Sequence, residues 1–132
     1  MTDYTVARRN DVLNYWRGAG APPAISGVYL ELFNGDPQSG GASVQSTITG
    51  SANRTNVTSA MGAASSGSST NASVITVTAA AVSGATVTHL AIYDAVTSGA
   101  LICSHALSTG NLVVSTGNPV QINANGLTLS LA

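Results

Sequence analysis

The sequence predicts a mainly β protein, a single jelly-roll or β-sandwich domain with a short N-terminal helical arm. Three observations lead to this fold class. Helical periodicity of apolar residues occurs only near the N-terminus, short alternating runs fill the rest of the 132 residues, and turn signals recur about every ten residues. The chain divides accordingly into an arm with a Gly/Pro hinge at 1–23 and a β domain at 24–132.

Residues 5–17 are predicted to form the helix of the arm. Val12, Leu13 and Trp16 fall at helical spacing and form an apolar stripe. The run GAGAPP at 18–23 ends the helix, because glycine is entropically costly in a helix and proline cannot continue one.

The first strand is predicted at 27–33, where the period of the apolar residues changes to two. Val28, Leu30 and Leu32 share one face of this strand. The run NGDP at 34–37 then predicts a turn.

The middle of the chain, residues 38–72, is polar and rich in Gly and Ser. One or two short strands are expected near 43–48 and 55–60. The run GAASSGSS at 62–69 is expected to be a mobile loop, because its composition is that of a flexible linker.

The second half alternates more regularly and predicts six further strands, giving about eight in all. The strongest spans 85–94, with Leu90 and Ile92 on one face. The predicted strands lie at 73–79, 85–94, 100–107, 111–115, 119–122 and 126–131.

Charged side chains are few, and this limits the possible partners. They make up 7% of the chain, where an average domain has about 25%, and the net charge is −1. Such a surface is poorly protected against self-association, which predicts that copies of the chain or a partner cover much of it. The alternative is a monomer kept in solution by hydroxyl and amide groups.

The positions of the charges argue against two further classes of partner. Three of the four basic residues, Arg8, Arg9 and Arg17, lie in the arm, so the body lacks the basic stripe of a nucleic-acid-binding protein. No run is long enough for a transmembrane helix, and no signal-peptide core is present. We therefore expect no nucleic acid and no membrane among the partners.

No catalytic, metal-binding or cofactor-binding motif is predicted. A nucleophile, base and acid could be drawn only from scattered residues, without a Gly-x-Ser-x-Gly turn. Cys103 and His105 would project from one strand face, but no second clustered pair completes a metal site. The scattered candidates are His89, Asp94, Ser104 and His105.

The order of motifs resembles that of small tailed-bacteriophage virion proteins. The matching runs are VYLELFNGDP at 28–37, VTHLAIYDAVTSGALI at 87–102 and LTLSL at 127–131. Such proteins are usually labelled tail-fibre proteins, and some similar jelly rolls act as cement or decoration proteins on capsids. The resemblance implies a structural role in the virion after synthesis in the host cytoplasm.

From this resemblance we expect a capsid cement or decoration protein on the outer capsid surface. It would bind the major capsid protein shell and stabilise it as a homo-oligomer, with a trimer favoured over a dimer. The arm would bury its apolar stripe and pair its arginines with capsid carboxylates, because Trp and Arg are frequent interface anchors. The residues expected in this contact are Arg8, Arg9, Val12, Leu13, Trp16 and Arg17.

Three alternatives remain open. The helix could instead pack on its own sandwich. The protein could be a tail-fibre or receptor-binding component whose loops at 62–69 and 108–111 recognise a host glycan. The third alternative is that the protein is an enzyme of unknown type.

Overall fold

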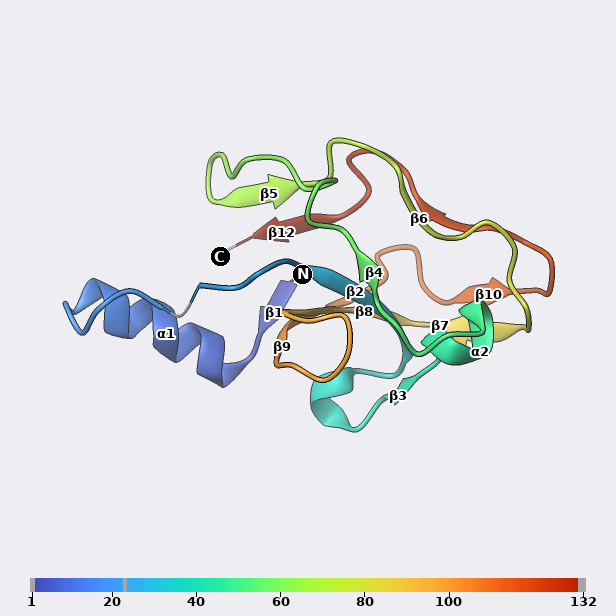
Figure 1. Ribbon diagram of the computed structural model, residues 1–132, viewed down its shortest axis with the longest axis horizontal. Coiled ribbons are helices and arrows are strands. Elements are labelled where there is room, and N and C mark those ends of the chain that lie inside the picture. Colours follow the sequence, from blue (N-terminus) through green and yellow to red (C-terminus); the bar gives the residue numbers. More distant parts are fainter. Residues whose placement is uncertain (1, 23, 131–132) are drawn as a thin grey trace.

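The computed structural model describes residues 2–22 and 24–130, and it confirms a mainly β chain with one helix near the N-terminus (Figure 1). The helical segments are α1 Val6–Trp16, the 3-10 turn η1 Pro37–Ser39 and α2 Gln45–Thr49. The strands are β1 Thr2–Tyr4, β2 Tyr29–Asn34, β3 Ala42–Ser43, β4 Thr55–Asn56, β5 Ser68–Thr70, β6 Ile75–Thr78, β7 Ala85–Val87, β8 His89–Tyr93, β9 Leu101–Ala106, β10 Leu112–Val114, β11 Val120–Ile122 and β12 Thr128–Ser130.

The largest sheet has the strand order β1-β9-β8-β2-β3, and β4 also pairs with β2. The remaining strands form three antiparallel ribbons, β7 with β10, β6 with β11 and β5 with β12. In Figure 1, β5, β12 and β6 lie above the large sheet. α1 extends from one end of the molecule, and β7, β10 and α2 lie at the other end.

The pairings of the second half are nested around the β8–β9 hairpin. β7 pairs with β10, β6 with β11 and β5 with β12, so the chain from β5 onward folds back on itself at the β8–β9 turn. A jelly roll arranges eight strands as two facing sheets. The described strands join instead into one larger sheet and three separate ribbons, so the mainly β class is confirmed and the jelly-roll arrangement stays a prediction.

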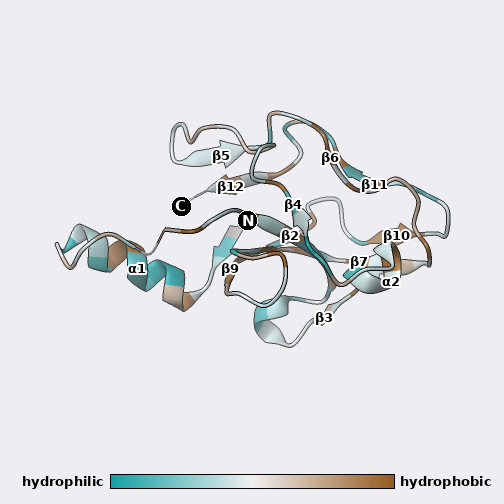
Figure 2. Cartoon of the chain, in the orientation of Figure 1, coloured by the Kyte–Doolittle hydropathy of each residue, from teal (hydrophilic) through white to brown (hydrophobic). Residues whose placement is uncertain are grey.

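The hydrophobic core includes side chains from both the large sheet and the ribbons. Leu30 and Leu32 of β2, whose shared face was predicted, are at most 1% exposed. Burial of such side chains stabilises a fold by about 1.5–3 kcal/mol each. Figure 2 shows brown, hydrophobic segments in both the large sheet and the ribbons. The core comprises Leu30, Leu32, Ile48, Val57, Ile75, Ala81, Val87, Leu90, Ile92, Cys103, Val114, Val120 and Leu127.

The strand expected at 43–48 is wrong, because most of this segment is the short helix α2. The Gln45 side chain is buried and accepts a hydrogen bond from the backbone N–H of Leu32 (3.2 Å). Ile48 is fully buried in the core, and Gly50 ends the helix with a φ of 76°. Long-range burial of two side chains therefore outweighs local β propensity in this segment.

The single strand expected at 85–94 is divided at Thr88. β7 pairs with β10, whereas β8 pairs with β2 and β9. The Thr88 backbone N–H donates to Phe33 O (2.9 Å), and Thr88 O accepts from Leu107 N–H (3.0 Å). Thr88 thus lies where one extended segment leaves the β7–β10 ribbon and enters the large sheet.

The segment 62–69, expected to be a mobile loop, folds back as a hydrogen-bonded hairpin. Ser65 and Ser68 bond to each other through their backbones (2.8 and 3.0 Å). Ser66 and Gly67 between them have φ values of 51° and 79°. Positive φ at both central residues is the geometry of a tight type I′ hairpin turn.

Most other strand predictions are confirmed with shorter bounds, and β1 and β5 were not predicted. The expected strand at 55–60 is limited to β4, and that at 126–131 to β12. Leu131 of the last predicted strand and Pro23 of the hinge lie outside the described residues. The division of the chain at residue 23 stays a prediction.

Candidate functional site

The candidate site is α1 together with the groove beside it. Thr5 caps the helix, since its Oγ1 accepts a hydrogen bond from the backbone N–H of Arg8 (3.4 Å). At the other end Gly18 has a φ of 86° and donates to Tyr15 O, while Ala19 N–H donates to Asn14 O. This pair of bonds is a Schellman motif, which requires a left-handed residue and so explains the glycine. The predicted helix at 5–17 is therefore confirmed.

α1 is attached to the body through its N-terminal end. β1 pairs with β9 in antiparallel register, and Thr5 Oγ1 donates to Leu101 O (3.3 Å). Arg8 Nη2 then forms an ion pair with Asp94 Oδ2 (2.8 Å). No residue of α1 is buried, so the helix contacts the body without entering its core. No helix among the described residues is long and apolar enough to cross a membrane.

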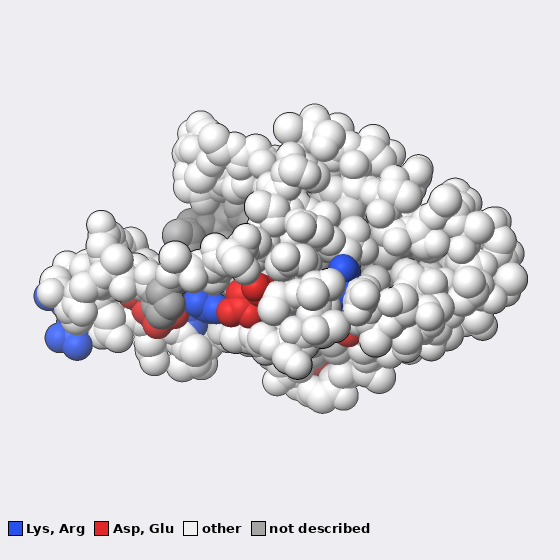
Figure 3. Space-filling model, viewed as in Figure 1, with Lys and Arg blue, Asp and Glu red and all other residues white. Residues whose placement is uncertain are grey.

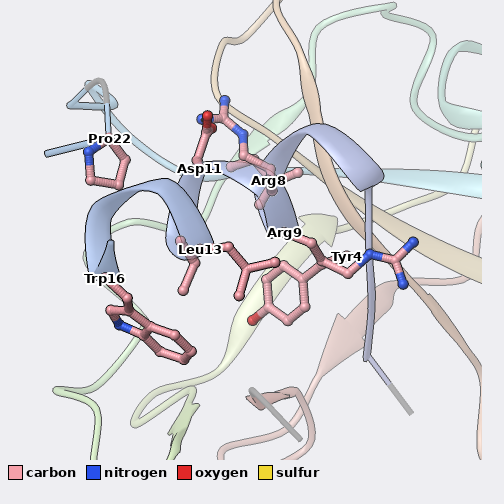
Figure 4. Close-up of a pocket in the computed structure, with 9 residues that line it drawn as sticks. Tyr4, Arg8, Arg9, Asp11, Leu13, Trp16 and Pro22 are labelled. Atoms are coloured by element: carbon pink, nitrogen blue, oxygen red, sulfur yellow. The ribbon is translucent and has the colours of Figure 1, made fainter. Parts of the chain in front are cut away.

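A groove of about 530 Å³ lies beside the helix (Figure 4). Figure 4 shows Tyr4, Leu13 and Trp16 on one side of α1, whereas Arg8 and Asp11 lie on the opposite side. Leu13 is 56% exposed and Trp16 is 72% exposed. The lining residues are Tyr4, Arg8, Arg9, Asp11, Val12, Leu13, Trp16, Pro22 and Ile102.

The structure brings five of the six predicted arm residues to this groove. Four further lining residues were missed: Tyr4, Asp11, Pro22 and Ile102. Tyr4 and Ile102 were missed because nothing in the sequence shows that β1 and β9 are neighbours. Arg17 lies at the helix end and donates from Nε to Asn14 Oδ1 (2.9 Å). The role of these residues in partner binding stays a prediction.

The charges of the arm divide into paired and unpaired groups. Arg8 contacts both Asp94 and Asp11, the latter at 3.5 Å. Arg9 and Arg17 are exposed, and neither forms an ion pair with a described residue. Figure 3 shows blue atoms at the far end of the helix, apart from the red and blue atoms that lie together where the arm meets the body. The unpaired arginines would favour a partner that carries carboxylates.

The residues considered for chemistry make separate contacts. Ser104 Oγ donates to Asp36 Oδ1 (3.2 Å) and accepts from Gln38 Nε2 (2.9 Å). His89 Nδ1 contacts Thr88 Oγ1, and His105 Nδ1 contacts Ala106 O. Within residues 2–22 and 24–130, no group of three or more His, Cys, Asp or Glu side chains could hold a metal ion.

Cys103 is a residue of β9 and is paired with Tyr4 of β1. It is fully buried, and burial, with a smaller contribution from the negative charge of Asp3, raises its pKa to about 12. Burial likewise raises the pKa of Tyr4, and the nearby Cys103 adds to this shift. A neutral, inaccessible thiol behaves as a small apolar side chain of the core.

A family model described as podophage GP4 fiber I protein gp80 matches residues 1–130. No curated protein matches the chain at a significant level. The match covers the arm and the β domain together.

Proposed function

The chain belongs to the podophage GP4 fiber I protein gp80 family, and from this premise we propose that it is a non-enzymatic, homo-oligomeric component of a podophage fibre that attaches through α1. The observation that carries the proposal is the family match over residues 1–130. Membership makes the chain a phage virion structural protein. The fibre location is the more specific part of the proposal, and the family description supports it.

The groove beside α1 supports the proposed attachment. Leu13 and Trp16 expose apolar surface there, and a partner that covered them would gain about 25 cal/mol per Å² of apolar area removed from water. Arg9 and Arg17 at the same arm would pair with carboxylates of the partner. We propose that the partner is a neighbouring virion protein with an acidic, partly apolar surface.

Capsid decoration was the first expectation from the sequence and is the second candidate here. The same exposed arginines and apolar side chains would suit a clamp on the major capsid protein. We rank the fibre role first, because the family description names a fibre protein. Receptor binding by the 62–69 hairpin is a variant of the fibre proposal.

Copy number and location separate the two candidates. We expect quantitative mass spectrometry of purified virions to give far fewer copies of this chain than of the major capsid protein. Labelled antibodies should bind the tail region in electron micrographs. A copy number close to that of the capsid protein, with label over the whole head, would support decoration and contradict the fibre proposal.

Substitutions in the groove test attachment through α1. The double variant Leu13→Ser and Trp16→Ser should yield virions that lack this protein, while the purified variant keeps its β structure by circular dichroism. Val113 of β10 is 72% exposed, like Trp16, and lies outside the groove, so Val113→Ser is the matched control. Normal incorporation of the double variant would contradict attachment through the groove.

A further inference from the structure

The N-terminal segment is held to the body mainly by one short strand pair. β1 contributes three residues to its ladder with β9. Outside the ladder, the polar contacts are the Thr5 bonds to Leu101 O and Ile102 O, the Arg8–Asp94 ion pair and a bond from Gln38 Nε2 to Asp3 O (2.8 Å), and Tyr4 packs against the hydrophobic core. All these contacts lie before the middle of α1. None of them depends on the path of the chain after the helix.

The segment that follows α1 has the properties of a hinge. Residues 17–22 and 24–26 are exposed, and those at 20–22 and 24–26 form no hydrogen bond with another described residue. Gly18 and Gly20 have φ values of 86° and 100°, and no atom lies within 4 Å of a Cβ built at either. The path of this segment is therefore fixed by few interactions. From Arg17 to Val28 it could span about 35 Å if extended.

We propose that β1 and α1 are exchanged between copies of this chain, with β1 of one copy paired to β9 of a neighbour. The exchanged form keeps every strand, cap and ion-pair contact described above and changes only the hinge. Exchange of an identical element is for this reason a low-cost route to an oligomer. A net charge of −1 adds little repulsion between copies.

The exposed surface favours exchange over the closed chain. In the closed chain Leu13 and Trp16 remain more than half exposed. In an exchanged oligomer the hinge, which follows directly after Trp16, has to run to a second copy, and this brings another chain close to the exposed apolar surface. The exchange concerns the protein in solution and goes beyond the proposed function. Its tests therefore do not depend on where the protein lies in the virion.

The register of β1 and β9 offers a direct test. Thr5 N–H donates to Ile102 O (3.0 Å), which makes Thr5 and Ile102 a hydrogen-bonded pair. Tyr4 and Cys103 are the next pair in the register and are therefore a non-hydrogen-bonded pair, in which side chains approach most closely. Cys103 is the only cysteine of the chain. A Tyr4→Cys substitution thus places one new thiol opposite the native one.

The purified Tyr4→Cys protein is oxidised with oxidised glutathione, which accepts the two electrons of the new disulfide, and is then denatured and run on a non-reducing gel. We expect covalent species of more than one chain that a reductant converts to single chains. The largest of these species gives the number of chains in the oligomer. A disulfide closed within single chains would overturn the proposal. The double variant Tyr4→Cys, Cys103→Ala has no thiol opposite residue 4. Cross-linked species that persist in this variant would show that the disulfide does not join residues 4 and 103, and would overturn the proposed contact between β1 and β9 of neighbouring copies.

Light scattering provides the second measurement. The wild-type chain should have the mass of an oligomer, and removal of residues 1–4 should reduce it to one chain while circular dichroism retains the β signal. A single-chain mass for the wild type would overturn the exchange. An oligomer that persists without β1 would overturn it equally.

Discussion

Arg8 and Asp94 join the N-terminal helix to the end of β8, with 2.8 Å between Arg8 Nη2 and Asp94 Oδ2. The second oxygen of the same carboxylate, Oδ1, accepts a hydrogen bond from the backbone N–H of Ala100 (2.7 Å). Asp94 therefore stabilises both the β8–β9 turn and the attachment of α1. Its two side-chain oxygens have separable roles.

Asp94→Asn should weaken the attachment of α1 more than the turn, because an amide oxygen can still accept from Ala100 N–H while the ion pair is lost. Both side chains are less than a quarter exposed, so we expect a loss of about 1 kcal/mol in the free energy of unfolding. Denaturant unfolding measures this loss, and faster hydrogen exchange in α1 would locate it. Asp11→Asn, which removes only the longer contact to Arg8, is the control and should cost less than about 0.5 kcal/mol.

The elements predicted from sequence are those whose local pattern agrees with their tertiary role. α1 has both its cap and its stop signal within the segment, and β2 and β9 carry enough alternation to be identified. α2 could not be predicted, because this helix is stabilised by the buried contact of Gln45 with β2, which the local sequence pattern does not show. The residues of the groove were only partly predicted for the same reason, because Tyr4 and Ile102 are brought together by the β1–β9 pair.

Arg54→Met should be strongly destabilising, because Arg54 is the cation beside the buried carboxylate of Glu31. Arg54 Nε lies 2.6 Å from Glu31 Oε2, and the guanidinium stacks 3.5 Å from the centre of the Tyr93 ring. Loss of one partner leaves an uncompensated buried charge, which costs about 3–5 kcal/mol. Denaturant unfolding should show this loss, whereas Arg17→Met should change stability by less than about 0.5 kcal/mol. Adding Glu31→Gln should recover part of the stability, and no recovery would mean that the unpaired carboxylate is not the cause.

Asn71→Ala should also be strongly destabilising, because this fully buried amide satisfies three backbone groups. Its Nδ2 donates to Ser73 O (2.9 Å) and Asn123 O (2.8 Å), and its Oδ1 accepts from Leu127 N–H (2.8 Å). Leaving these groups unpaired should cost about 3 kcal/mol by thermal or denaturant unfolding. The matched control is Asn123→Ala, because the Asn123 side chain is exposed and its role in this network is through the backbone. Equal effects of the two substitutions would contradict this account of Asn71.

Stability should fall at alkaline pH through Cys103. Burial raises the pKa of this thiol from 9.0 to about 12, so between these values the folded state keeps a proton that the unfolded state has lost. The contribution is fully present below about pH 9 and is lost as the pH rises toward 12, at about 1.4 kcal/mol per pH unit. Cys103→Ala removes this dependence and retains that of the tyrosines, two of which, Tyr4 and Tyr93, have a pKa raised chiefly by burial. The difference in unfolding free energy between wild type and Cys103→Ala should therefore be constant near pH 8 and should decrease between about pH 9 and 10.5. Parallel stability curves over that range would show that the thiol is not the group responsible.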